Sequence, residues 1–370
     1  MIYHLVNDEK VINRAIEIFE KAFPSENIFI VFKSGKFTYV NKGINVISYK
    51  DFYGTFKGEK PTSVIIHLMT NRKIKFINKY IDVNVPIYWA MWGSDLYDRL
   101  LMPKGYRLID KESSYYKSTK WLRAFKSIVK IPSDKARILR RIHFINKRVK
   151  YLVTSTIEDD YDVITDYYPQ LKTKIHKGFS YYPIDTVIGK EMIDLAVTGN
   201  SIQIGNSGTL SNNHEYVLRI LSSLKIENRK IIIPLSYSGE KEYKDKLIAT
   251  GREFFGDQIE AITKFLPLAD YNNLMASCSI AIYGNWRQEA VGNILVSLYL
   301  GAKVFLSRNN PILKWALRNG FVVYELESIT QEELDTPLKP ADKENNRKLL
   351  LSKYDMQELQ RNMNLIFEER

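Results

Sequence analysis

The fold is indicated most clearly by one stretch, Ile202-Gln203-Ile204-Gly205-Asn206-Ser207-Gly208-Thr209-Leu210-Ser211-Asn212-Asn213-His214. Its apolar start is typical of a buried strand, and the small polar residues that follow open a helix expected over residues 215–224. Gly205 and Gly208 let the backbone approach an anion closely, while the helix start offers N–H groups and the positive end of a dipole. The stretch predicts a phosphate-binding loop between strand and helix. A plain turn with a Ser or Asn cap is the alternative.

The spacing of glycines and of metal-ligand residue types argues against several enzyme classes. The loop lacks the Gly-x-Gly-x-x-Gly order of dinucleotide folds and the Gly-Lys-Ser/Thr ending of an NTPase loop. No Gly-x-Ser-x-Gly elbow occurs, and no His and carboxylate cluster has the spacing of a metal site. We therefore expect neither redox, NTPase nor hydrolase chemistry, and no bound metal or other cofactor.

Composition indicates a globular protein of two or three domains. The chain has 370 residues and 45% hydrophobic content, which is ample for buried cores. Its single cysteine, Cys278, excludes an intrachain disulfide. No apolar run reaches the roughly 18 residues of a membrane span, and the first residues lack a signal-peptide pattern. A cytoplasmic location is expected.

The net charge of +12 is concentrated in one segment, residues 99–150. Sixteen Lys or Arg against three Asp or Glu give this segment +13, so the rest of the chain sums to −1. Between residues 117 and 130 the apolar and basic positions separate at helical spacing, which favours an anionic membrane surface. Nucleic acid and a merely solvated basic face are the alternatives. The expected membrane-facing residues are Lys117, Lys120, Trp121, Arg123, Phe125, Lys126 and Lys130.

Short apolar runs alternate with helical patterns in both halves of the chain. Such alternation predicts an α/β fold with two doubly wound parallel-sheet, Rossmann-like domains and a cleft between them. The pattern loosens over residues 174–194, which hold one strand-like stretch at 179–182. We therefore expect an N-terminal domain over 1–185, which carries the basic segment, and a second domain over 195–340. Helices over 341–370 are expected to pack across the junction.

Three further groups of residues could carry chemistry. The segment 283–293 offers Arg287 for phosphate and Gln288, Glu289 and Asn293 for sugar hydroxyls. In the first half, Trp92, Gly93 and Ser94 follow a strand and precede Asp95, which is either a general base or a helix cap. His67, also after a strand, is a second candidate base, although a lone His there is more often structural.

These segments together resemble, in the same order, the bacterial 4-acetamido-4,6-dideoxygalactosyltransferases. These are the TDP-Fuc4NAc:lipid II Fuc4NAc transferases of enterobacterial common antigen assembly. The segments that carry the resemblance are Trp92 to Tyr97, Ile204 to Gly208 with Ser211, Asn212 and His214, the segment with Pro234 and Tyr237, and Arg287-Gln288 followed by Gly292. The chain departs from the family pattern at Glu289, where we expect Gln, and at the Thr209-Leu210 insert.

The resemblance implies a metal-independent glycosyltransferase of the GT-B fold. It implies that the second domain binds the nucleotide-sugar donor, and that the first binds an undecaprenyl-diphosphate-linked acceptor at the cytoplasmic face of the inner membrane. A GT-B polyol-phosphate transferase and a nucleic-acid-binding protein remain alternatives. Asp95 or His67 would lie near the acceptor hydroxyl, beside Trp92, Gly93 and Ser94. The expected donor-binding residues are Gly205, Asn206, Ser207, Gly208, Ser211, Asn212, His214, Tyr237, Tyr283, Arg287, Gln288, Glu289, Gly292 and Asn293.

Overall fold

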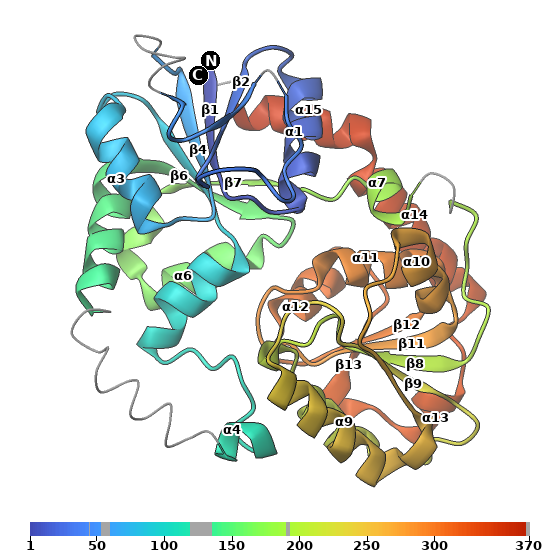
Figure 1. Ribbon diagram of the computed structural model, residues 1–370. Helices are drawn as coiled ribbons and strands as arrows, with labels where there is room; N and C mark the ends of the chain where they lie inside the picture. The colour runs from blue at the N-terminus through green and yellow to red at the C-terminus, as the bar shows by residue number, and fades with distance from the viewer. Residues whose placement is uncertain (44, 53–59, 119–134, 190–192, 368–370) are drawn as a thin grey trace. The chain divides into compact units, whose positions relative to one another are not determined.

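The computed structural model describes residues 1–43, 45–52, 60–118, 135–189 and 193–367, which form two compact units. Unit 1 consists of the described residues within Met1–Tyr106, Val129–Pro183 and Tyr354–Arg370. Unit 2 consists of those within Arg107–Ile128 and Ile184–Lys353. Each unit contains one parallel sheet with helices beside it (Figure 1).

Unit 1 is built on a seven-stranded sheet with the order β3-β2-β1-β4-β5-β6-β7. All neighbouring strands run parallel. A further helix covers residues 135–148. The elements are β1 (Ile2–Val6), α1 (Val11–Ala22), β2 (Asn27–Val31), β3 (Val46–Ser48), β4 (Ser63–His67), α3 (Asn71–Tyr80), β5 (Ile87–Ala90), the π-helix η1 (Ser94–Leu101), η2 (Met102–Lys104), β6 (Val149–Ser155), α6 (Asp159–Tyr167), η3 (Pro169–Thr173), β7 (Ile175–Phe179) and α15 (Met356–Phe367).

Unit 2 repeats this architecture with a six-stranded parallel sheet in the order β10-β9-β8-β11-β12-β13. Its elements are α4 (Ser114–Ser118), α7 (Ile184–Ile188), β8 (Ser201–Ile204), η5 (Leu210–Asn212), α8 (His214–Leu221), β9 (Ile231–Pro234), α9 (Lys241–Phe255), η6 (Gly256–Gln258), β10 (Ile259–Ile262), α10 (Leu268–Ala276), β11 (Cys278–Tyr283), α11 (Val291–Leu300), β12 (Lys303–Leu306), α12 (Pro311–Arg318), β13 (Tyr324–Glu325), η7 (Leu326–Ser328), α13 (Gln331–Asp335) and α14 (Pro340–Tyr354).

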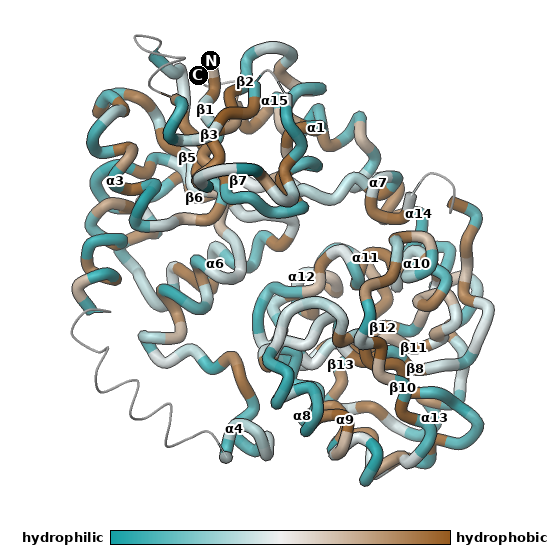
Figure 2. Tube along the Cα trace, viewed as in Figure 1, coloured by the Kyte–Doolittle hydropathy of each residue, from teal (hydrophilic) through white to brown (hydrophobic). Residues whose placement is uncertain are grey.

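The central strands of both sheets are covered on both faces, which explains their nearly continuous apolar sequences. Every residue of β1, β2, β4 and β5 is buried, as is every residue of β9 and β12. Figure 2 shows the hydrophobic residues gathered along the strands of each sheet. Parallel strands need such two-sided cover because crossover helices lie on both faces. The expected fold class of two doubly wound parallel sheets is confirmed.

Each sheet has one point at which the strand order reverses. In unit 1 this switch point lies between β1 and β4, and in unit 2 it lies between β8 and β11. The loops after such strands leave the carboxyl edge of the sheet in opposite directions and open a crevice between them. Ligands of open α/β sheets bind at this crevice. The topology therefore marks one candidate site in each unit.

The structure differs from the expected organisation in the basic segment. Residues 107–118 belong to unit 2, not to the first domain. Tyr115 is buried in the hydrophobic core of unit 2, and its hydroxyl donates to Glu240 at 2.6 Å. The Ser114 amide donates to Glu215, at the start of α8, at 2.8 Å. An aromatic anchor and a carboxylate cap thus hold this part of the segment against unit 2.

The expected membrane-facing residues are only partly covered by the structure. Lys117 is exposed and pairs with Glu112 at 2.6 Å. The other expected positions, Lys120, Trp121, Arg123, Phe125, Lys126 and Lys130, lie outside the described residues. Within the described ranges, none of the helices combines the length and apolar character needed to cross a bilayer.

Two further expectations differ in detail. The strand near residue 180 is β7, which covers Ile175–Phe179 and ends where the expected stretch begins. The C-terminal residues divide between the units, because α15 contacts α1 in unit 1 whereas most of α14 belongs to unit 2.

Candidate active site

The two segments that the sequence singled out in unit 2 meet at its switch point. The loop 205–213 follows β8, and the segment 284–290 follows β11. Asn213 Nδ2 donates to the Gly284 carbonyl at 3.0 Å, and Asn285 Nδ2 donates to the Ser211 carbonyl at 3.3 Å. Side-chain amides thus join the two loops that flank the crevice.

Glu289 is the central acceptor of this junction. Its carboxylate accepts from Ser211 Oγ at 2.7 Å, from Asn285 Nδ2 at 2.9 Å and from Arg287 Nε at 3.0 Å. Burial opposes its ionisation, but the Arg287 guanidinium and these hydrogen bonds hold the pKa of Glu289 below its usual value. The charge of Arg287 is therefore balanced by a carboxylate, and an anionic ligand must compete with Glu289 for it.

The glycines of the loop serve packing within the protein. Gly205 has φ +67°, and a Cβ there would lie 2.7 Å from both Asn212 Oδ1 and His214 Nε2. A Cβ on Gly208 would lie 2.8 Å from the Ser238 carbonyl and 2.3 Å from Lys244 Cε. This is a correction, because we expected the glycines to make room for an anion.

Several loop amides are also used inside the protein. The Gly205 amide donates to Ile282 at 2.9 Å, and the Gly208 amide donates to Tyr237 at 2.8 Å. The Asn206 amide donates to Asn212 Oδ1 at 3.0 Å. The binding of an anion at this loop would therefore depend more on side chains, and less on backbone amides, than the sequence predicted. Ser207, on the same loop, is buried, and its hydroxyl accepts from Asn212 Nδ2 at 3.0 Å.

Among the expected donor-binding residues, His214 and Tyr283 are fully buried. His214 has no exposed surface, its Nδ1 lies 2.9 Å from the Tyr243 hydroxyl, and its Nε2 faces Gly205. Burial lowers the pKa of His214 to about 3, so its imidazole is neutral at physiological pH. Tyr283 is a fully buried strand residue whose hydroxyl lies 2.9 Å from Ser297 Oγ. Both residues support the loops from within the unit.

Lys244 is the residue that sequence reasoning missed. It lies in the first turns of α9, and its Nζ is 3.2 Å from the position that a Cβ on Gly208 would take. Among the described residues this ammonium has no hydrogen bond or ion pair. The sequence places Lys244 in a helix with other lysines, and only the approach of the 236–239 turn to Gly208 distinguishes it.

The remaining candidates lie around the same crevice with partly exposed side chains. Tyr237 is 55% exposed, and Gln288 and Gly292 are half-buried. Asn293, in the first turn of α11, donates through Nδ2 to the Tyr271 hydroxyl at 2.5 Å. All four therefore present some surface, and the Asn293 amide is also engaged by Tyr271.

In unit 1, Asp95 is a buried acceptor within η1, whose N-cap residue is Gly93 and has no side-chain cap hydrogen bond. Its carboxylate accepts from the Trp92 amide at 2.7 Å, from Trp89 Nε1 at 2.8 Å and from the Met69 amide. Burial raises the pKa of Asp95 even though these donors act in the opposite direction. These hydrogen bonds join the loop after β4 to β5 and to the loop that follows β5. The geometry gives Asp95 the structural role of joining these segments, and it supports neither the expected helix cap nor an exposed base.

His67 is likewise an internal residue. It is fully buried at the end of β4, with Nε2 3.0 Å from His4 Nδ1 and Nδ1 2.5 Å from the Tyr181 hydroxyl. Burial lowers its pKa well below the usual value. Both ring nitrogens are occupied, so His67 does not face a substrate as we expected. Lys73 supports the same turn, because its Nζ donates to the His67 carbonyl at 2.6 Å.

The expected acceptor residues do reach the carboxyl edge of unit 1. Trp92, Gly93 and Ser94 follow β5, are half-buried, and lead into the π-helix η1. Segments of π-helix occur often at functional sites. Tyr97, a residue of η1, donates to Asp160 at 2.5 Å, and burial raises the pKa of Asp160 to about 7.

No group of three or more His, Cys, Asp and Glu residues that could hold a metal ion occurs within the described ranges. Near the unit 2 crevice, the described residues supply hydrogen-bond donors, the cations Lys244 and Arg287, and the Glu289 carboxylate.

Several solved structures share this fold. Sucrose-phosphate synthase from Thermosynechococcus elongatus is 7% identical, with a TM-score of 0.68 over 100% of this chain and 98% of that one. Anabaena HepE, solved with UDP and glucose, is 12% identical, with a TM-score of 0.64 over 100% and 99%. WaaG, a glycosyltransferase involved in lipopolysaccharide biosynthesis, is 11% identical, with a TM-score of 0.57 over 99% and 100%. This likeness shows the GT-B fold.

A family model also matches the chain. Residues 137–342 match the model described as 4-alpha-L-fucosyltransferase, glycosyl transferase group 56. The match covers more than half of the chain and includes both segments of the unit 2 crevice.

Proposed function

The chain belongs to glycosyl transferase group 56, the 4-alpha-L-fucosyltransferase family, and is a glycosyltransferase; we propose that it moves an acetamido-deoxy sugar from a nucleotide-diphosphate donor to a polyprenyl-diphosphate-linked acceptor. The donor in this proposal is TDP-Fuc4NAc or a close relative. The reaction would serve the assembly of a cell-surface polysaccharide at the cytoplasmic face of the inner membrane.

The observation that carries the donor half of the proposal is the unit 2 switch point. Two cations, Arg287 and Lys244, lie in or beside the loops that flank it. Arg287 contacts Ser211 through NH2 at 3.4 Å, and Lys244 lies at Gly208. Positive charges that two elements bring to one loop suit the binding of a nucleoside diphosphate. HepE, which has the same fold, was solved with UDP.

The proposed chemistry is stabilisation of the leaving group. When the bond from the sugar to the diphosphate breaks, negative charge develops on the diphosphate oxygen. Cations already placed at that position stabilise this charge without reorganisation. We propose that Lys244 and Arg287 supply this stabilisation and that no metal ion is required. The acceptor hydroxyl attacks the sugar and loses its proton to a group that we do not assign.

The test is a thermal-shift screen of the full chain against TDP-, UDP-, GDP- and CDP-linked compounds, followed by a transfer assay. A ligand that binds only the folded state raises the midpoint of unfolding. We expect a TDP or UDP compound to raise it, and Arg287→Ala to abolish transfer while the protein stays folded. Unchanged turnover of Arg287→Ala would sink the leaving-group assignment. Preference for CDP-polyols would favour the polyol-phosphate transferase alternative, and loss of activity with EDTA would refute metal independence.

A further inference from the structure

Unit 1 contains a pocket lined by four arginines at its own switch point. The cavity has a volume of about 420 Å³. Asn7 follows β1 and Thr70 follows β4, the two strands between which the order reverses, and both line the pocket. No Asp or Glu is among its described lining residues. The arginines are Arg72, Arg99, Arg137 and Arg141.

The four guanidinium groups come from three separate elements. Arg72 lies in the first turn of α3, Arg99 lies on the π-helix η1, and Arg137 and Arg141 lie on the helix over residues 135–148. Arg72 and Arg99 make no hydrogen bond or ion pair with other described residues. The α3 N-terminus, capped by Thr70, adds the positive end of a helix dipole.

Such convergence of like charges indicates an anionic ligand. Arg72 and Arg99, which make no ion pair with other described residues, repel each other at this cavity, and an anionic ligand relieves that repulsion. Arg141 is only 7% exposed, so its charge is partly desolvated even before a ligand binds. The planar guanidinium forms paired hydrogen bonds with phosphate oxygens. Several arginines together suit a group with two or more negative charges, such as a diphosphate.

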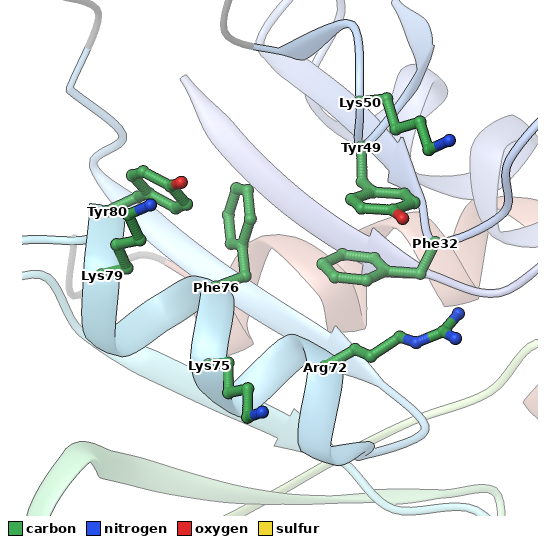
Figure 3. Close-up of a pocket in the computed structure, with 8 residues that line it drawn as sticks. All are labelled: Phe32, Tyr49, Lys50, Arg72, Lys75, Phe76, Lys79 and Tyr80. Carbon is green, nitrogen blue, oxygen red and sulfur yellow. The ribbon is translucent and has the colours of Figure 1, made fainter.

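A second pocket of about 430 Å³ adjoins the first and shares Phe32 and Arg72 with it. Its walls are aromatic, because Phe32 stacks on Tyr49 at 5.4 Å and meets Phe76 edge-on at 5.5 Å. Figure 3 shows these three rings together, with the charged side chains of Arg72 and Lys75 beside them on α3. The pocket thus combines an apolar wall with a cationic margin.

We propose that the two pockets form one binding site for an isoprenoid diphosphate, with the diphosphate among the arginines and the first isoprene units against Phe32, Tyr49 and Phe76. This inference rests on the proposed function, in which such a group carries the acceptor. Ring faces bind an apolar chain without the hydrogen bonds that a nucleobase or sugar needs. Arg72 lies at the boundary of the two pockets, where the diphosphate joins the chain.

The test is calorimetric titration of the full chain with farnesyl diphosphate, inorganic diphosphate and farnesol, without any donor. Farnesyl diphosphate is expected to bind more tightly than the other two. Arg99→Ala is expected to weaken both diphosphates about tenfold, since one charged hydrogen bond is lost. Arg140→Ala, on an exposed residue of the helix 135–148 outside the pocket, is the matched control and should change neither.

The aromatic pocket is tested separately. Tyr49→Ala should weaken farnesyl diphosphate severalfold and leave inorganic diphosphate unchanged, whereas Tyr39→Ala, at an exposed tyrosine outside the pocket, should change neither. Equal affinity of the two diphosphates would overturn the isoprenoid assignment. Unchanged affinity for farnesyl diphosphate in Arg99→Ala would overturn the site.

Failure of this inference is distinguishable from failure of the proposed function. If nucleotide-sugar binding and sugar transfer are measured but no prenyl diphosphate binds, only the unit 1 site is wrong. If nucleotide compounds lose affinity in Arg99→Ala, the arginine pocket binds the donor and the inference is overturned. If no nucleotide sugar binds the wild-type chain, the proposed function fails whatever the prenyl titrations give.

Discussion

Replacement of Lys244 by methionine tests the donor site most sharply. Methionine keeps most of the unbranched stem and removes the ammonium that lies at Gly208. If that ammonium binds the donor diphosphate, the variant loses one charge-assisted hydrogen bond, which is worth about 1.5–3 kcal/mol. The dissociation constant for a nucleoside diphosphate should then rise roughly 10- to 150-fold. Stability should not change, because the ammonium has no partner among the described residues.

The measurement is a calorimetric titration of the nucleoside diphosphate that gives the largest thermal shift, at low and at high salt. The affinity of the wild-type protein should fall with salt more steeply than that of Lys244→Met, because salt screens the lost interaction. Lys241→Met on the same helix is the matched control, since the Lys241 side chain is 88% exposed and pairs with Asp245. An unchanged dissociation constant in Lys244→Met, or equal losses in both variants, would refute the reasoning.

Three other changes test the energetics of the site. Gly205→Ala should unfold at a lower temperature and bind the nucleotide more weakly, because its Cβ would lie 2.7 Å from atoms of two side chains. Gly256→Ala is the control: Gly256 also has positive φ, but no atom lies within 4 Å of its Cβ position, so this variant shows the backbone strain alone, about 1–2 kcal/mol. Equal losses in the two would contradict the packing argument. The pKa of Asp160 is about 7 in the folded protein and 3.8 in the unfolded chain. As the pH rises from about 4 to 7, the buried carboxyl therefore lowers the free energy of unfolding, by roughly 4 kcal/mol in full. Asp160→Asn should therefore raise the melting temperature more at pH 8 than at pH 4, and a larger gain at pH 4 would reverse the assignment. In Glu289→Gln, Arg287 loses its carboxylate partner. The variant should therefore bind nucleoside diphosphates more tightly, while its free energy of unfolding falls by about 1–3 kcal/mol. Weaker binding by a folded variant would show that the carboxylate itself contacts the donor.

The sequence was most informative where burial is complete. Central strands such as β9 and β12 are covered on both faces, so their apolar runs identified them and their order of alternation with helices. The edge strands β3 and β7 were missed or misplaced. β3 has three half-buried residues, and β7 is mostly exposed or half-buried. An edge strand pairs on one side only, and its pattern is correspondingly weak.

The site was predicted in part for a similar reason. The loop 205–213 and Glu289 were identified because small and polar residues follow apolar strands, a local pattern. Whether such a residue faces a ligand or the interior depends on neighbours far away in the chain. His67 lies between His4 and Tyr181, and Asp95 binds an amide 26 residues away. Buried partners of this kind leave no signal near the residue itself.

By itself the sequence determined that the chain has two doubly wound α/β units, because each strand and helix is specified by contacts that repeat over a few residues. It also determined where the polar loops lie along the chain. Only the tertiary structure decided which strands flank each switch point, that Lys244 approaches Gly208, and that arginines from α3, η1 and the helix 135–148 line one pocket. Those arrangements depend on strand order and on long-range packing, for which a single sequence carries no periodic pattern. The phosphate-binding role first assigned to the loop backbone consequently passes, in our proposal, to the side chains that the fold brings beside it.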